Sequence, residues 1–451
     1  MNVSSNTHSL GLVLSRARGM MTACFLMTGA ALPAQEVMNW EASSHFQLNF
    51  HEVVPGLNAA GRHVVTVRFS VTDPLNGGAA WDILNAPEFK QPAGASRLFV
   101  DFGWATADYQ NTGAANEALA PVPFRVVGGV PSGGGAGVGT ALPVMVDALR
   151  NARLVGPGFP GWYEVTGVLP VQASGSGVVL LEGHPAWPTV QADGSTLWER
   201  VPVTSAHRFF AITDVAPVPR REVVQLNKCQ QCHDGELHRG IEIPRLSLHG
   251  GNWTENLDVC VTCHNPNQTD IAYRTSGDET PIDFKYLVHA IHGTKRRQDP
   301  LVVVGFRGAV NDYSGVHFPS TVANCVVCHA DNGRRGTFEL PLAASVVGST
   351  LDSRSVPGVQ VDVDPANDLK MTPTVSVCSS CHDSNKALGH MMSRKTGGSF
   401  SATLADMGSG RVVERCVTCH GPGKDKSVRK VHEIEEVKSS RRKSARATDE
   451  D

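Results

Sequence analysis

The chain divides into two halves with different hydrophobic patterns. From about Gln35 to Asp214, apolar and polar residues alternate in short runs, as in residues 63–71 and 178–182, and Gly, Pro, Asn and Ser separate these runs. A period of two is typical of β-strands with one buried face. Short strands at this spacing are typical of antiparallel folds, so we predict an all-β Greek-key sandwich or barrel for residues 35–216.

The alternation ends at Val215. Beyond it the pattern predicts mostly loops with short helical pieces, such as Phe284–His292, and apolar runs are sparse over about 220 residues. Such a segment cannot build an ordinary side-chain core, so we expect another group to fill its interior. We therefore predict a multidomain chain with a second domain at residues 217–435. The charged end, residues 436–451, is typical of a disordered tail.

The N-terminus has the pattern of an export signal. Arg16 and Arg18 precede an apolar run at residues 19–32, which is too short to span a bilayer, and Pro33-Ala34 precede a plausible cleavage before Gln35. We predict a signal peptide at residues 1–34, with lipidation at Cys24 as an alternative. Since no later segment has about 18 uninterrupted apolar residues, we expect no transmembrane span. The protein is then exported, to the periplasm or to the outer membrane and cell surface.

Composition narrows the function. The 451 residues contain 40 Lys and Arg against 43 Asp and Glu, a net charge of -3, which argues against a nucleic-acid binder driven by positive charge. Cysteine and histidine are the unusual residues, with 11 Cys and 18 His. Ten of the eleven cysteines lie between Cys229 and Cys419, within the second half.

All ten of these cysteines belong to Cys-x-x-Cys-His motifs, the attachment signature of c-type haem. Two thiols three residues apart can form thioethers with the two vinyl groups of one porphyrin, and the adjacent histidine supplies an iron ligand. Zinc ribbons, disulfides and redox cysteine pairs are alternatives, but zinc usually takes two pairs per metal and a thioredoxin-type pair needs no histidine. We therefore predict five covalently bound haem c groups, attached at Cys229 and Cys232, Cys260 and Cys263, Cys325 and Cys328, Cys378 and Cys381, and Cys416 and Cys419, with the proximal ligands His233, His264, His329, His382 and His420.

Each iron also needs a ligand on its other side. Outside the motifs, the second half offers seven histidines for five positions: His238, His249, His289, His292, His317, His390 and His432. His289 and His292 are three residues apart on the predicted helix, a spacing that lets neighbouring side chains serve two haems. The residues alone leave the choice among the seven open.

Several phrases around the motifs resemble the OmcA/MtrC family of outer-membrane multihaem cytochromes. The resemblance covers roughly residues 60–432 and rests on Leu-Ser-Leu-His-Gly-Gly-Asn at 246–252, Leu-Val-His-Ala-Ile-His at 287–292, Tyr-Ser-Gly-Val-His-Phe-Pro at 313–319, His-Met at 390–391, Gly-Gly-Ser-Phe at 397–400, His-Gly-Pro-Gly at 420–423 and Leu-Glu-Gly-His-Pro at 181–185. It implies bis-histidine haems with distal ligands at His249, His289, His292, His390 and His432, which leaves His238 and His317 over.

The resemblance also implies a function. A multihaem cytochrome of this family is expected to relay electrons in respiration, to extracellular acceptors such as Fe(III) or Mn(IV) oxides or flavins. Its expected partners are other multihaem cytochromes or a porin complex. Family members with ten haems have two β domains alternating with two pentahaem modules, and this chain has one of each, so it resembles half of such a protein.

An enzyme is the alternative hypothesis. A pentahaem redox enzyme of the nitrite-reductase kind has one open haem site, whose motif characteristically ends in Lys. All five motifs here end in His. We therefore favour an electron carrier without an open catalytic haem. A third interpretation, compatible with the carrier, makes the β domain a docking module.

Overall fold

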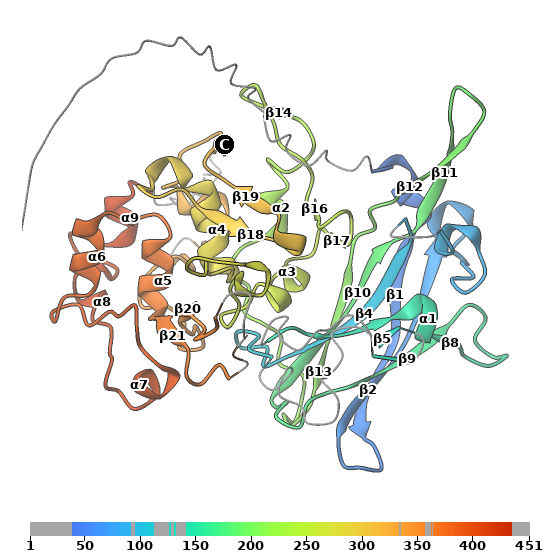
Figure 1. The fold of residues 1–451 in the computed structure, drawn as a ribbon, viewed down its shortest axis with the longest axis horizontal. Helices are drawn as coiled ribbons and strands as arrows, with labels where there is room; N and C mark the ends of the chain where they lie inside the picture. The colour runs from blue at the N-terminus through green and yellow to red at the C-terminus, as the bar shows by residue number, and fades with distance from the viewer. Residues whose placement is uncertain are drawn as a thin grey trace, which may run out of the picture. The chain divides into compact units, whose positions relative to one another are not determined.

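Two antiparallel β-sheets pack face to face in the N-terminal half of the protein (Figure 1). The computed structural model describes residues 38–91, 95–111, 126–127, 130–131, 141–332, 335–356, 362 and 364–434. The predicted signal peptide with Cys24, and the predicted tail at 436–451, lie outside these residues. From residue 37 onward the chain forms one compact unit.

The first sheet has the order β1-β2-β9-β8, with β3 also paired to β2, and the second has the order β13-β10-β4-β7-β5-β6. All strand pairs of the two sheets are antiparallel except β5 with β7. β11 and β12 form a separate hairpin. The strands of this half are β1 Gln47–Leu57, β2 His63–Asp73, β3 Ala79–Ala80, β4 Arg97–Trp104, β5 Val126–Val127, β6 Val130–Pro131, β7 Val144–Asp147, β8 Arg153–Leu154, β9 Tyr163–Val168, β10 Ser176–His184, β11 Ala186–Val190, β12 Thr196–Arg200 and β13 Ala206–Ala211, with the short helices η1 Glu41–His45, η2 Pro74–Asn76, η3 Pro87–Phe89 and α1 Ala148–Asn151.

The predicted sandwich is confirmed, and no sheet closes into a barrel among the described strands. The two runs that alternate most clearly in the sequence became β2 and β10. Val65, Val67, Phe69 and Val71 of β2 point into one core, which both sheets line. Alternation thus places every second side chain of β2 between the sheets.

Strands β4 and β10 of the second sheet are buried on both faces. Along β4, Leu98, Val100, Phe102 and Trp104 enter the core between the sheets. The residues between them face the C-terminal half, and a second apolar cluster joins Val178 and Leu180 of β10 to residues 259 and 261. β4 and β10 therefore lie between the sandwich core and the segment that contains the second cysteine motif.

The C-terminal half is assembled from short helices and two-stranded hairpins, as predicted, and the expected helix at residues 284–292 is present as α4. Its helices are α2 Leu226–Cys229, α3 Leu257–Cys263, η4 Ile271–Tyr273, α4 Phe284–His292, η5 Thr294–Arg296, η6 Phe306–Gly308, η7 Cys325–Val327, α5 Pro373–Ser379, α6 Asn385–Met391, α7 Leu404–Gly408, α8 Val417–His420 and α9 Val428–Val431. Its strands are β14 Leu237–His238, β15 Ile241–Glu242, β16 Ser247–Leu248, β17 Trp253–Thr254, β18 Val302–Val304, β19 Val310–Asp312, β20 Ser349–Asp352 and β21 Leu369–Met371.

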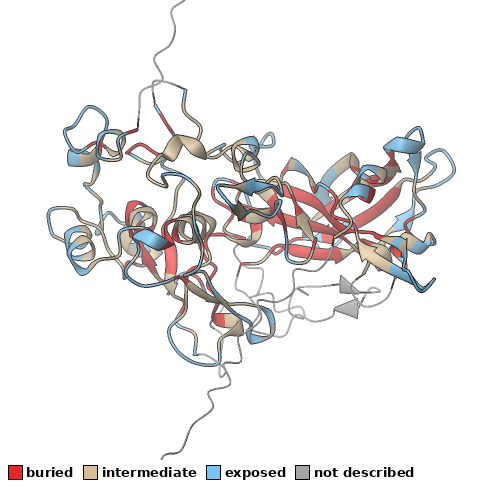
Figure 2. Ribbon diagram, turned by 90° about the horizontal axis from the view of Figure 1, so that it is seen from above, coloured by how far each residue is buried: buried red, intermediate tan, exposed pale blue. Residues whose placement is uncertain are grey.

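Burial differs sharply between the halves. Figure 2 shows buried strands concentrated in the sandwich, whereas the C-terminal segments are mostly half-buried or exposed. Neither apolar cluster found in the described part of the chain lies wholly within the C-terminal half. Within the same residues, no helix is long and apolar enough to cross a membrane.

Candidate functional site

Each Cys-x-x-Cys-His motif folds as a single helical turn. In all five, the backbone N–H of the histidine donates to the carbonyl of the first cysteine, at 2.8 to 2.9 Å. In the first motif, the N–H of Cys232 also donates to the carbonyl of Cys229, at 3.1 Å. This turn places the two thiols and the imidazole of a motif close together. We number the sites 1 to 5 in chain order, with motif histidines His233, His264, His329, His382 and His420.

Local sequence explains these turns. Asn256 caps α3, since its side chain accepts the N–H of Asp258 at 3.1 Å, and Pro373 begins α5, where its missing N–H costs no hydrogen bond. Ser384 caps α6 in the same way as Asn256, by accepting the N–H of Ala387. Three of the short helices, α3, α5 and α6, are therefore fixed at their N-termini by local sequence.

The ten predicted attachment thiols are unpaired and mostly shielded from water. None of them forms a disulfide, and nine of the ten, Cys232 included, are half-buried. Burial raises the pKa of the Cys229 thiol to about 11 and that of Cys260 to about 12, and it raises the pKa of Cys263 well above its usual range. Since a thiol with a raised pKa is a poor nucleophile at neutral pH, these three cysteines lack the character of catalytic or redox-active thiols.

Every motif histidine faces a second imidazole. The five pairs and the separations of their ring centroids are His233–His292 at 6.1 Å, His264–His249 at 6.0 Å, His329–His289 at 5.8 Å, His382–His432 at 6.0 Å and His420–His390 at 6.2 Å. An iron bound by both imidazoles, at about 2 Å from each nitrogen, separates the ring centroids by roughly 6 Å. The spacing therefore fits one six-coordinate iron in each pair.

Hydrogen bonds orient many of these rings. Nδ1 of His264 bonds the carbonyl of Ile282 at 2.8 Å, and Nδ1 of His420 bonds the carbonyl of Lys426 at 2.8 Å. His292 and His432 use the carbonyl four residues earlier in the chain, at 2.8 and 2.9 Å. A proton on Nδ1 leaves Nε2 with a free lone pair, the tautomer that a metal-binding histidine needs.

Burial also favours the neutral form of several of the paired imidazoles. It lowers the pKa of His249 to about 4 and that of His329 to about 3, and it lowers the pKa of His264, His289 and His292. Only a neutral imidazole offers a lone pair to a metal. The lowered pKa values therefore favour the same metal-binding form of histidine as the hydrogen bonds to Nδ1.

The five histidines that face the motif histidines come from segments outside the motifs. His249 adopts a left-handed φ of 54° in a turn that continues through Gly250 and Gly251, whose φ values are 74° and 88°. This turn lies before α3, whereas His289 and His292 are on α4, and His390 is on α6. His432 directly follows α9.

Two of the seven candidate histidines face no motif. His238 bonds Asp234 at 2.9 Å. His317 makes no ring contact with a motif histidine within the described residues, although its neighbour Phe318 packs on His292 at 5.5 Å. The described residues also contain no cluster of three or more His, Cys, Asp or Glu that could hold a metal ion.

The sites follow one another in space. The cysteines of successive sites lie near one another: Cys260 near Cys229, Cys229 near Cys328, Cys325 near Cys381, and Cys378 near Cys416. Sites 1 and 3 are close at two points, since Cys328 lies near both Cys229 and Cys232. Backbone contacts agree, since Gln225 donates to the carbonyl of Cys328 at 3.2 Å. The spatial order of the sites is therefore 2-1-3-4-5, which differs from the chain order.

Site 2 lies against the sandwich. Asn111 donates to the carbonyl of Thr262 at 2.9 Å, and the Tyr109 hydroxyl bonds Asp258 at 3.0 Å. Gly103 of β4 leaves no room for a side chain, since a Cβ there would lie 2.6 Å from the methyl group of Thr262. Sequence reasoning missed these contact residues, because nothing in the pattern of β4 shows that its second face is covered.

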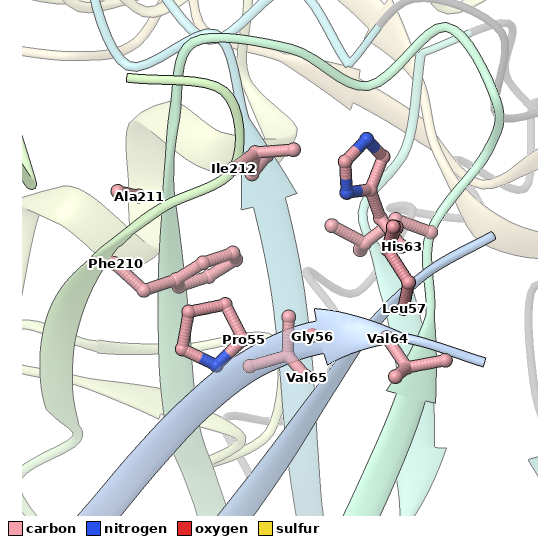
Figure 3. A pocket seen from close by; sticks show the side chains of 10 residues that line it. Pro55, Gly56, Leu57, His63, Val64, Val65, Phe210, Ala211 and Ile212 are labelled. Atoms are coloured by element: carbon pink, nitrogen blue, oxygen red, sulfur yellow. The ribbon is translucent and has the colours of Figure 1, made fainter. Parts of the chain in front are cut away.

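A pocket in the sandwich contains none of the predicted site residues. It has a volume of about 230 Å³ and is lined by the ends of β1 and β13 with His63 at its side (Figure 3). Its walls are apolar, with Pro55, Val65 and Phe210 among them. The five histidine pairs lie outside this pocket, in the C-terminal half.

Five cysteine pairs, each beside two facing imidazoles in a segment without its own apolar core, define a multihaem c-type cytochrome. Comparison with known families agrees: residues 221–433 match the family described as outer membrane cytochrome MtrC/MtrF-like, domains II/IV. Residues 221–433 are therefore similar to the MtrC/OmcA family. None of the curated proteins compared with the chain matches it.

Proposed function

We propose that residues 217–435 bind five haem c groups and relay electrons between redox partners. The observation that supports this most strongly is the set of five imidazole pairs at 5.8 to 6.2 Å, one at each attachment motif. In this proposal the ten motif cysteines hold the porphyrins. The axial ligands are His233 with His292, His264 with His249, His329 with His289, His382 with His432, and His420 with His390.

The two histidines proposed for each iron determine the redox properties of the site. A haem with two imidazole ligands supplies one-electron chemistry at a lower potential than one with histidine and methionine. Since each motif histidine has a facing partner, no site offers an open coordination position for a substrate. This favours a carrier over the alternative, a pentahaem enzyme with one open haem site.

The spatial order of the sites gives the proposed relay two ends. Sites 2 and 5 are the ends of the order 2-1-3-4-5, and site 2 lies against the sandwich. We propose that the β-sandwich domain, residues 35–216, supports this end, and that electrons leave or enter mainly at the other.

The family match indicates where in the cell the protein acts. Members of the family are described as outer-membrane cytochromes. We propose that this chain is likewise exported behind a signal peptide at residues 1–34. It would pass electrons to extracellular acceptors, such as iron or manganese oxides or flavins, with other multihaem cytochromes or a porin complex as partners.

Counting haem and determining its spin state test the proposal. The purified holoprotein should contain five haem c per chain by pyridine haemochrome assay and mass spectrometry. Its ferric EPR spectrum should contain only low-spin signals. Replacement of His390 by Ala should leave one haem high-spin, whereas His238→Ala and His317→Ala, as matched controls, should leave the spectrum unchanged. Fewer than five haems, or a high-spin signal in the wild type, would contradict the assignment.

A further inference from the structure

The surface around site 5 is strongly cationic. Residues 385–433 contain nine Lys and Arg against four Asp and Glu, a net charge of +5, although the whole chain has a net charge of -3. Three of the nine cations are paired: Arg411 with Asp406 at 3.4 Å, Lys430 with Asp425 at 3.0 Å, and Arg429 with Asp331 and Glu339. The other six are Lys386, Arg394, Lys395, Arg415, Lys424 and Lys426, which we call the cationic collar.

All six collar residues are exposed, and none forms an ion pair with a carboxylate in the described part of the chain. A buried or paired cation would contribute mainly to local structure. The electrostatic potential of exposed and unpaired cations extends into the solvent, where it can attract an anionic partner.

Each collar residue lies in or beside a segment that contains a proposed ligand or attachment residue of site 5. Lys386 lies one helical turn before His390 on α6, on the same face. Arg415 precedes the attachment pair directly, its N–H donates to the carbonyl of Thr396 at 2.7 Å, and its guanidinium donates to the carbonyl of Arg394 at 3.3 Å.

The remaining contacts complete the collar. The carbonyl of Lys426 accepts the Nδ1 hydrogen bond of His420 at 2.8 Å, which places the loop of Lys424 and Lys426 beside the motif. The Thr396 hydroxyl donates to the carbonyl of His390 at 2.9 Å, which places Arg394 and Lys395 beside α6. All six collar residues therefore lie in segments beside a single site, although they come from three separate parts of the chain.

Apolar side chains are exposed among these cations. Met392 is 53% exposed, Val413 is 52% exposed and Val417, between the two attachment cysteines, is 37% exposed, while Cys419 is itself exposed. An apolar centre with a charged rim is typical of protein interfaces, and small interfaces of this kind are typical of transient electron-transfer complexes. A bound haem has two propionate groups, which can neutralise only part of a collar of six.

We propose that the cationic collar is the docking surface for an acidic redox protein that exchanges electrons with the protein at site 5. The proposal rests on the proposed function, since site 5 must hold haem. The apolar side chains and the spread over three segments favour a protein partner over a small anion. An anionic membrane surface is the competing occupant, which the experiment distinguishes.

A charge-reversal experiment tests the collar. The variant Lys386→Glu/Lys395→Glu/Lys424→Glu is compared with the control Lys90→Glu/Arg239→Glu/Arg296→Glu, which changes the net charge equally through exposed residues outside site 5. Both holoproteins are first assayed for five haems per chain, so a failure of the proposed function is recognised separately. The probe is an acidic flavodoxin in its hydroquinone form, and haem reduction is followed by stopped-flow absorbance.

Electrostatic steering predicts the outcome. The wild-type second-order rate constant should fall about tenfold between low and high ionic strength. The collar variant should be about tenfold slower at low salt and nearly independent of salt, whereas the control should stay within about twofold of wild type.

Two results would overturn the proposal. One is equal rates for the collar variant and the control. The other is an unchanged flavodoxin rate combined with loss of binding to phosphatidylglycerol vesicles in the collar variant alone, which would assign the collar to a membrane surface.

Discussion

At the residue scale, Asp101 is the most unusual group of the sandwich. It lies on the face of β4 that meets site 2, is completely buried, and neither carboxylate oxygen has a hydrogen-bond partner among the described residues. Burial raises its pKa well above the usual range, and nearby Glu182 raises it further, while Arg97 partly opposes both. Arg97 itself is engaged with Glu182 at 2.7 Å. Asp101 is therefore a carboxyl group that the fold favours in its protonated form.

This predicts a pH dependence of stability. Because its pKa is higher in the folded than in the unfolded protein, the folded state binds more protons between the two values. The contribution of Asp101 to stability is then lost as pH rises from the unfolded pKa through the folded pKa. Asp101→Asn should reduce the decline of the urea midpoint between pH 5 and pH 8. The same decline in variant and wild type would show that Asp101 stays ionised in the fold.

The paired histidines show what could be predicted from sequence at this scale. All ten residues that form the five imidazole pairs were candidates, because the motif spacing and the family phrases identify them. The pairing itself was not predicted, since His432 faces His382 across 50 positions and His292 faces His233 across 59. Such distances follow from the folded path of the loops, which local patterns do not encode. Asp101 was missed for the same reason.

At the element scale, the contact between β4 and α3 joins the two halves. A Cβ at Gly103 would meet the Thr262 methyl group at 2.6 Å, so the strand and the helix lie as close as glycine permits. Gly103→Ala should therefore destabilise the protein by about 1–3 kcal/mol, measured by urea unfolding.

A double variant checks the physical cause. Thr262→Ser removes the methyl group and retains the hydroxyl that donates to the carbonyl of Asp258 at 2.6 Å. Gly103→Ala/Thr262→Ser should recover most of the lost stability, giving a coupling free energy between the two positions. Additive losses would mean that strain elsewhere in β4, and not this contact, limits position 103.

Helix α4 offers a second prediction at this scale. His289 and His292 face different motifs, His329 and His233. His289→Met and His292→Met should each raise the potential of one haem and leave the others near their original values, because methionine ligation favours the reduced state. A redox titration with EPR detection measures this, with His317→Met as the control. A shift of two potentials in either variant would refute the separate assignment.

Sequence patterns predicted some secondary-structure elements and missed others. The period of two identified β2 and β10, and the spacing of apolar residues identified α4. The hairpins of the C-terminal half have two to four residues per strand and were not predicted, since so few residues show no period. The burial of both faces of β4 depends on α3, which lies more than 150 residues later in the chain.

At the scale of the whole molecule, the two halves differ in whether apolar side chains form their interior. The sandwich has an apolar cluster of its own, while the described residues of the C-terminal half form no such cluster alone. The chain without haem should therefore keep a folded sandwich but lose cooperative structure in residues 217–434. Hydrogen exchange on a variant with all ten motif cysteines changed to Ser measures this. Protected amides throughout residues 217–434 would show that the polypeptide folds there without its cofactor.

Helix α4 connects two sites through a single rigid turn. His289 and His292 are displaced by about 4.5 Å along one helix axis, and no loop lies between them. Thermal motion that shifts α4 moves both imidazoles together, so the separation of sites 1 and 3 is held constant while the loops around them fluctuate. The step between these two sites should consequently be the least sensitive to solvent viscosity and hydrostatic pressure, and any gating by motion should arise at the neighbouring steps.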